Sequence, residues 1–234
     1  MAIDFLKLPF EFDEQLLLRD LDICQEYVWK DHFNTSDYVG EWKIIALRST
    51  TGESVEITAS PAQDYKDTEL LSACSYFKKA IDTLECEKES VRLMSLAAGS
   101  LIKEHTDNML TYLEGNFRIH IPIRTEPEVT FFFNKVPVNM KVGEMWYGDF
   151  SMPHSIEHLG KFPRVHLVID CLRNDWSDQL FKNAGFDFEY YKRLANEKRM
   201  RDLPFIISNL EHMGDPKNFA LIAELKAELE ICQK

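Results

Sequence analysis

Two imidazoles and one carboxylate stand in a pattern that suits a metal ion. His105 and Asp107 are two residues apart, and on a strand such residues point to the same face. His154 follows forty-seven residues after Asp107, far enough for one or two hairpins to bring the chain back. Two imidazoles and a carboxylate on one face of an octahedral ion leave three open positions, as non-haem Fe(II) oxygen chemistry requires. The helical HExxH motif of zinc hydrolases is absent. These residue types therefore predict an iron site.

A single arginine follows this pattern at a suggestive distance. Arg164 stands ten residues after His154 and begins an apolar stretch that we interpret as the strand Val165–Cys171. A guanidinium group matches a carboxylate with two parallel charge-assisted hydrogen bonds. A buried arginine beside an iron site could therefore anchor the far carboxylate of 2-oxoglutarate.

Another strand carries polar residues where water is not expected. In Phe117–Thr125, phenylalanine and isoleucines occupy one face, and Arg118 and His120 lie on the other. A solvated strand face usually carries Lys, Glu, Thr and Ser, so this pattern favours the wall of a polar cavity. His166 follows Arg164 with the same alternation, and for it we predict a structural hydrogen bond.

Apolar periodicity predicts a β-rich centre with helices on both sides of it in the sequence. Strands are expected at Trp42–Leu47, Ser90–Ala97, Phe117–Thr125, Val129–Asn134, Val138–Lys141, Glu144–Tyr147 and Val165–Cys171. Helices are expected at Asp13–Tyr27, Asp67–Leu84, Asp175–Lys182, Glu189–Arg199, Phe205–His212 and Lys217–Ile231. Gly185, Pro204 and Gly214-Asp215-Pro216 should separate the last four. Short strands at this spacing indicate a sandwich or barrel.

Composition excludes several classes of partner. The 234 residues carry a formal net charge of −12, which argues against binding to nucleic acid. No basic leader with an apolar core and no bilayer-length apolar run is present, so we expect neither secretion nor a membrane partner. Five scattered cysteines without a CxxC pair favour a reducing compartment, and we predict a cytoplasmic protein.

The stretch from Arg92 to Asp175 resembles the aspartyl/asparaginyl β-hydroxylase family of 2-oxoglutarate oxygenases, which also includes free-proline hydroxylases. The matching segments are Gly99–Asn108, Phe117–Pro122, Gly143–Trp146, Pro153–Ser155 and Arg164–Asp170, and Trp42–Ser49 is similar to the N-terminal part of bacterial members. One departure is His158, which stands where an asparagine is common. Asp107 is present although the animal enzymes replace this carboxylate, so a full triad is expected.

The resemblance implies a mainly β fold with α, a double-stranded β-helix (a cupin-like jelly roll). It implies Fe(II) bound by His105, Asp107 and His154, with 2-oxoglutarate as cosubstrate and O₂ as oxidant. Arg164 would hold the distal carboxylate of 2-oxoglutarate, and Arg118 and His120 match residues near its other end or near the substrate. We expect an oxygenase domain at residues 1–175, which includes N-terminal helices, and a C-terminal helical segment at residues 176–234, packed on or beside it.

The expected activity is hydroxylation of an unactivated C–H of an amino acid, free or within a peptide. Arg48, Arg118 and Arg124 are each candidates to receive a substrate carboxylate, and a homodimer is an open alternative to a monomer. Two other readings are compatible with the same residues. One is a cupin-like metal enzyme that does not use 2-oxoglutarate, and the other is a non-catalytic β-barrel that binds a ligand.

Overall fold

The computed structural model describes residues 4–59, 63–107 and 110–232 of the chain, so Asn108 of the matching segments lies outside them. Two compact units make up the chain. The larger ends at Phe186 and contains the sheets, and the smaller begins at Asp187 and is helical.

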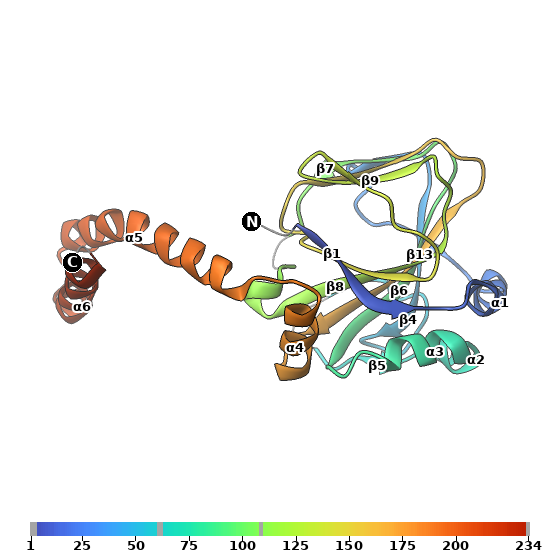
Figure 1. Ribbon diagram of the computed structural model, residues 1–234, viewed down its shortest axis with the longest axis horizontal. Helices are drawn as coiled ribbons and strands as arrows, with labels where there is room; N and C mark the ends of the chain where they lie inside the picture. The colour runs from blue at the N-terminus through green and yellow to red at the C-terminus, as the bar shows by residue number, and fades with distance from the viewer. Residues whose placement is uncertain (1–3, 60–62, 108–109, 233–234) are drawn as a thin grey trace. The chain divides into compact units, whose positions relative to one another are not determined.

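Two antiparallel sheets form the larger unit (Figure 1). The large sheet has the spatial order β1 (Phe5–Glu11), β11 (Glu144–Gly148), β8 (Asn116–Arg124), β13 (Arg164–Leu172), β6 (Lys88–Leu96), β4 (Trp42–Ser49) and β2 (Lys30–Asp31), with β5 (Lys66–Asp67) paired to β4. The small sheet has the order β10 (Val136–Val138), β9 (Val129–Phe133), β12 (His154–His158), β7 (Leu101–His105) and β3 (Tyr38–Val39).

The connections between β6 and β13 identify the fold. In sequence order β6, β8, β11 and β13 lie in the large sheet, whereas β7, β9, β10 and β12 lie in the small sheet. The chain therefore winds back and forth between two facing sheets, which is the double-stranded β-helix, or jelly roll. The predicted fold class is confirmed.

Apolar side chains from both sheets meet between them. Ile44, Met94 and Val168 of the large sheet belong to one cluster with Ile102 and Phe131 of the small sheet. The outer face of the large sheet is covered by α1 (Glu14–Gln25), α2 (Glu69–Ala73) and α3 (Ser75–Asp82), as Figure 1 shows. The outer faces of β8 and β13 are apolar, whereas their inner faces carry five buried polar residues, namely Arg118, His120, Arg164, His166 and Asp170.

α4 (Asp175–Asn183) also belongs to the larger unit. Its Phe181 stacks on Tyr112, with ring centroids 3.8 Å apart, and touches Phe117 of β8. α5 (Phe188–Met213) and α6 (Phe219–Cys232) of the smaller unit pack on each other through Leu203, Ile207, Ile222 and Leu225. The packing of the C-terminal segment on the barrel stays a prediction.

One predicted strand is wrong, and two strands that carry site residues were not predicted. The stretch Val138–Lys141 was expected to be a strand, but β10 ends at Val138. Asn134 and Lys135 adopt positive φ (48° and 65°) and form a tight turn, which starts the return strand immediately at Val136. β7 and β12, which carry the two histidines of the metal pattern, were not among the predicted strands.

Two helix predictions are corrected. Asp67–Leu84 is not one helix, because Cys74 leaves the helical region (φ −102°, ψ 73°) between α2 and α3. Pro204 does not separate two helices but lies inside α5. A proline removes one backbone donor, and the turns on either side of it are held by Leu203 and Ile207 against α6.

Among the described residues, the helices include none with both the length and the apolar character needed to cross a bilayer.

Candidate metal site and cavity

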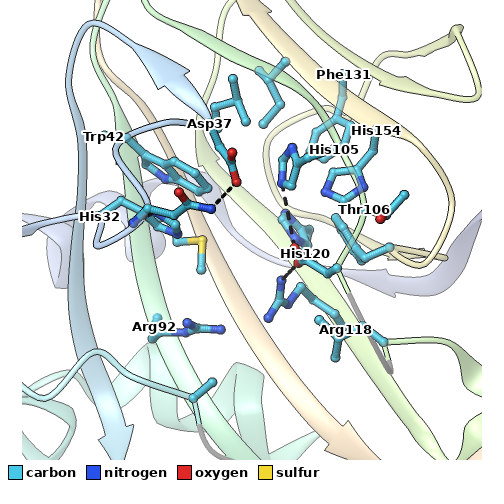
Figure 2. Close-up of a pocket in the computed structure, with 18 of the residues that line it drawn as sticks. His32, Asp37, Trp42, Arg92, His105, Thr106, Arg118, His120, Phe131 and His154 are labelled. Atoms are coloured by element: carbon cyan, nitrogen blue, oxygen red, sulfur yellow. Dashed lines mark hydrogen bonds and ion pairs between the residues drawn. The ribbon is translucent and has the colours of Figure 1, made fainter.

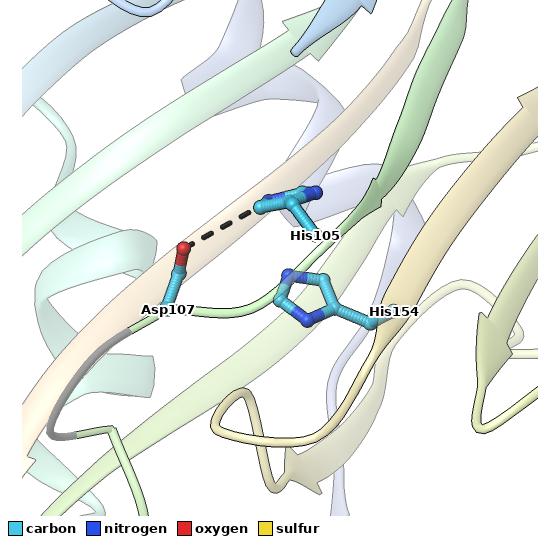
Figure 3. Close-up of side chains that lie close together, drawn as sticks. All are labelled: His105, Asp107 and His154. Atoms are coloured by element: carbon cyan, nitrogen blue, oxygen red, sulfur yellow. Dashed lines mark ion pairs between the residues drawn. The ribbon is translucent and has the colours of Figure 1, made fainter.

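Strand pairing in the small sheet brings the two histidines together. β7 ends at His105 and β12 begins at His154, and these two residues are directly paired across the antiparallel strands. Their ring centroids lie 4.2 Å apart (Figure 3). Asp107 is not on the strand, as the pattern had suggested, but two residues beyond its end. Its backbone N–H donates to the Phe150 carbonyl (2.8 Å), which fixes the segment beside the two rings.

Both imidazoles present the same nitrogen to one point. Nδ1 of His105 lies 2.7 Å from the Lys103 carbonyl oxygen and Nδ1 of His154 lies 3.0 Å from the Met152 carbonyl oxygen. A carbonyl only accepts, so each Nδ1 carries a hydrogen, and in the neutral ring Nε2 keeps its lone pair. Burial lowers the pKa of His154 to about 4, so this ring is neutral at pH 7.

The carboxylate of Asp107 completes the group. Its Oδ1 lies 3.8 Å from Nε2 of His105, and one ligand atom from each of the three residues lies within 4.8 Å of the others (Figure 3). Two imidazole nitrogens and one carboxylate oxygen thus lie close together. This donor set fits a divalent transition metal of the 2-His-1-carboxylate type.

A cavity of about 530 Å³ opens beside this group. All six residues predicted from the sequence line it, namely His105, Asp107, Arg118, His120, His154 and Arg164. Figure 2 shows His105 and His154 on one side and Arg92 and Arg118 at one end. Of the three arginines considered as carboxylate receptors, Arg48 and Arg124 do not line the cavity. Arg48 pairs with Asp67 instead.

Buried ion pairs hold two arginines at that end of the cavity. Arg118 donates from Nε and Nη2 to Asp170 (2.6 and 3.1 Å), and Arg92 donates from Nη2 to the same carboxylate (2.8 Å). Nη1 of Arg118 also donates to Oδ2 of Asp107 (2.7 Å). Arg118 therefore links the candidate metal ligand Asp107 to the anion Asp170 on the neighbouring strand β13.

Asp170→Asn is expected to destabilise the fold by about 3–5 kcal/mol, because two enclosed guanidinium groups would lose their shared anion. Asp170, Arg92 and Arg118 are all buried. Urea unfolding at pH 7 measures the effect, and Asp22→Asn, an exposed change on α1, is the control. An unchanged unfolding midpoint in Asp170→Asn would show that the pair contributes nothing to stability.

The same variant has a defined pH dependence. Burial alone would raise the pKa of Asp170, but Arg118 and Arg92 outweigh it and hold that pKa below its ordinary value. The folded-state pKa lies below that of the unfolded chain, about 3.9. This contribution is therefore complete above about pH 4 and is lost as pH falls through the lower, folded-state pKa. The stability difference between wild type and Asp170→Asn should shrink over that acid range.

Arg164 has no acidic partner among the ion pairs of the described residues. It is 2% exposed, and its guanidinium lies 5.7 Å from the centre of the Phe131 ring. Burial lowers its pKa to about 9, which expresses the cost of enclosing this cation without an anion. A cation held in this way at a cavity wall is a ready receptor for a carboxylate of a ligand.

His166 connects Arg164 to His120. Nη2 of Arg164 donates to Nδ1 of His166 (2.7 Å), and Nδ1 of His120 lies 3.2 Å from the same atom. A guanidinium never accepts, so Nδ1 of His166 is the acceptor and Nδ1 of His120 is the donor. Nε2 of His120 therefore carries a lone pair. The expected hydrogen bond of His166 is confirmed.

Unpaired buried atoms gather at this cavity. Four buried side-chain nitrogens have no hydrogen-bond partner among the described residues: Trp42 Nε1, Arg92 Nε, His120 Nε2 and Arg164 Nε. All four belong to residues that line the cavity. Buried polar groups are normally paired, so this concentration indicates that the cavity holds a polar ligand or ordered water.

Sequence reasoning missed several lining residues. Arg92 and Met94 lie two residues apart on the inward face of β6. The alternation of side chains in the predicted strand Ser90–Ala97 could therefore have identified Arg92 as a lining residue. His32 and Asp37 lie in the loop between β2 and β3, where side chains follow no regular periodicity that could have indicated them. Trp42, the first residue of an expected strand, is buried and also lines the cavity.

Comparison with protein families identifies this arrangement. The model of the aspartyl/asparaginyl β-hydroxylases matches residues 13–174, more than half of the chain. The chain belongs to the aspartyl/asparaginyl β-hydroxylase family. This confirms the resemblance seen in the sequence, and the HxD…H group is the triad that this family of Fe(II)/2-oxoglutarate oxygenases carries.

Two curated relatives of this chain are proline hydroxylases. The L-proline cis-4-hydroxylase of Rhizobium meliloti (strain 1021) is 26% identical over 179 residues, 74% of this chain and 62% of the relative. The L-proline cis-3-hydroxylase 1 of Streptomyces sp is 26% identical over 196 residues, 77% of this chain and 63% of the relative. The chain thus spans less than two thirds of the length of either relative.

Among solved structures, an oxidoreductase of the 2OG-Fe(II) oxygenase family from Burkholderia pseudomallei is similar with a TM-score of 0.48. It is 12% identical, and the match covers 74% of this chain and 86% of that one.

Proposed function

We propose that this protein is an Fe(II)- and 2-oxoglutarate-dependent hydroxylase of a small amino acid, with His105, Asp107 and His154 as the iron ligands. The observation that carries the proposal is the position of the triad and of the unpaired Arg164 in the wall of one cavity. A metal site alone would suit many enzymes. A buried arginine without an anion, in the same cavity, supports a dicarboxylate cosubstrate.

The chain's own residues would bind and orient the cosubstrate. Arg164 would bind the distal carboxylate of 2-oxoglutarate through its unpaired Nε and one terminal nitrogen of the guanidinium. Arg118 and His120 would lie near the other end. Because Nε2 of His120 carries a lone pair, it would face a carboxylate through a bridging water. His166 would hold the side chains of Arg164 and His120 in place.

When bound, Fe(II) with 2-oxoglutarate and O₂ would supply the oxidation of an unactivated C–H. The protein's share is to keep Nε2 of His105 and His154 unprotonated, to aim the carboxylate of Asp107, and to exclude water. Phe131 and Phe150, both buried, supply apolar surface to the cavity beside the two histidines.

We further propose that the substrate is a free amino acid such as L-proline, the substrate named for the two curated relatives. Arg92 would receive its carboxylate, since Nε of Arg92 is buried and unpaired in the cavity wall. Arg118, placed beside it by Asp170, adds positive charge at that end. The cytoplasmic location and a homodimer stay predictions.

Anaerobic reconstitution with Fe(II) and 2-oxoglutarate tests the proposal. We expect a visible metal-to-ligand charge-transfer band, which His154→Ala abolishes, and succinate release on addition of O₂ and L-proline. Iron binding without the band would instead favour a cupin-like enzyme that uses no 2-oxoglutarate. Absence of iron binding would favour a β-barrel that binds a ligand without catalysis.

A further inference from the structure

The loop between β2 and β3 places one carboxylate in the cavity wall. Asp37 is half-buried and lines the cavity, and Figure 2 shows its carboxylate directed into the space between Trp42 and His105. Asn34 donates from its side-chain amide to Oδ2, and Ser36 Oγ lies 3.2 Å from Oδ1. The Asp37 carbonyl accepts from the Lys103 backbone N–H (2.7 Å), which ties the loop to β7. The carboxylate is therefore oriented before any ligand binds.

The charge on Asp37 has no cationic partner among the ion pairs of the described residues. The other lining carboxylate, Asp107, pairs with Arg118 and belongs to the metal site. At the Arg92 end of the cavity the charge is positive. The cavity wall thus carries one negative group without a cationic partner, Asp37, and positive groups at the Arg92 end. This distribution is complementary to a zwitterion.

Stacked aromatic rings hold the loop that carries Asp37, and the histidine among them carries no positive charge to pair with it. The His32 ring stacks on Trp42 with centroids 3.7 Å apart and planes 3° apart, and Phe33 stacks on His32 at 4.5 Å. Nδ1 of His32 accepts from the Asn34 backbone N–H (3.2 Å), which holds the turn that leads to Asp37. Burial, and then the charge of Arg92, lower the pKa of His32 to about 4, so His32 is neutral at pH 7.

We propose that Asp37 is the ammonium subsite and selects a free α-amino acid over a residue within a peptide. This inference rests on the proposed function and names the substrate class of the same cavity. A secondary ammonium such as that of L-proline carries two N–H donors and a positive charge for Asp37. A peptide-bonded proline has neither. Binding it would leave the Asp37 carboxylate enclosed without a partner, which weakens binding and so favours the free amino acid.

The test compares L-proline with tetrahydrofuran-2-carboxylate, in which an ether oxygen replaces the ammonium, in wild type and Asp37→Asn. Each compound is titrated into the protein loaded with Fe(II) and 2-oxoglutarate without O₂, and the shift of the charge-transfer band gives its Kd. We expect Asp37→Asn to weaken L-proline at least about tenfold and the ether analogue by less than about twofold. Asp31→Asn, an exposed change on β2, is the matched control.

The outcomes separate the two proposals. If wild type gives no band with 2-oxoglutarate, the proposed function fails, and Asp37 loses its role with it. If the band forms and L-proline binds equally to wild type and Asp37→Asn, the ammonium subsite alone is wrong. If L-proline does not shift the band, the comparison uses the L-amino acid that shifts it most. If an N-acetylated amino acid shifts the wild-type band and no free amino acid does, the inference is overturned.

Discussion

Asp107→Ala is expected to reduce succinate release coupled to hydroxylation by more than about 100-fold, and to weaken Fe(II) binding by a similar factor. Loss of an outer partner of a metal ligand already costs about 10–100-fold, and here the ligand itself is removed. The change also deprives Arg118, which Asp170 holds in place, of an anion 2.7 Å away, so its positive charge would oppose a cation at the metal position.

Glu104→Ala provides the matched control for this variant, because Glu104 is an exposed acid on the same strand as His105. Iron affinity is measured by competition with a coloured chelator, and turnover by succinate release. Full turnover in Asp107→Ala would remove this residue from the iron site. Loss of iron in Glu104→Ala as well would mean that general charge, and not ligation, explains the result.

Arg164→Met is expected to raise the KM for 2-oxoglutarate about 100-fold or more and to change the KM for the amino acid by less than about threefold. A buried charge pair with two parallel hydrogen bonds would be lost, and truncation of such a pair costs about 2–5 kcal/mol. Methionine retains much of the apolar contact with Phe131, so the fold should tolerate the change.

Arg164→Lys and Arg124→Met sharpen this measurement. Lysine keeps the charge but not the planar fork, so Arg164→Lys should fall between wild type and Arg164→Met. Arg124 ends the neighbouring strand β8 and does not line the cavity, so Arg124→Met should leave both KM values unchanged. A 2-oxoglutarate KM that is unaltered in Arg164→Met would refute the assigned role.

Asp170 and His166 show how polar groups in this barrel depend on one another. Asp170 accepts hydrogen bonds from both Arg92 and Arg118, while His166 accepts from Arg164 and orients His120. These residues do not line the cavity themselves. Substitutions at Asp170 or His166 should therefore alter binding through the lining residues that they hold.

Local pattern was sufficient for much of the fold and of the candidate site. A strand has a side-chain period of two, so the alternation in β8 placed Arg118 and His120 on one face, and that face proved to line the cavity. The buried apolar strands β6, β8 and β13 were visible for the same reason. The motif of His105, Asp107, His154 and Arg164 was recognisable because its residue types and order suit one kind of chemistry.

Contacts that depend on long-range strand pairing could not be predicted from local pattern. His105 and His154 meet because β7 and β12 pair in one register, and neither short strand has a strong pattern of its own. Asp170 joins Arg92 to Arg118 only once three strands lie side by side. Asp37 reaches the cavity from a loop. The path of a loop is set by its tertiary contacts, and its side chains show no regular periodicity in the sequence. Residue types and local alternation indicate which groups this protein can use. The pairing of distant strands fixes which of these groups meet, because register is set by contacts that no local segment contains.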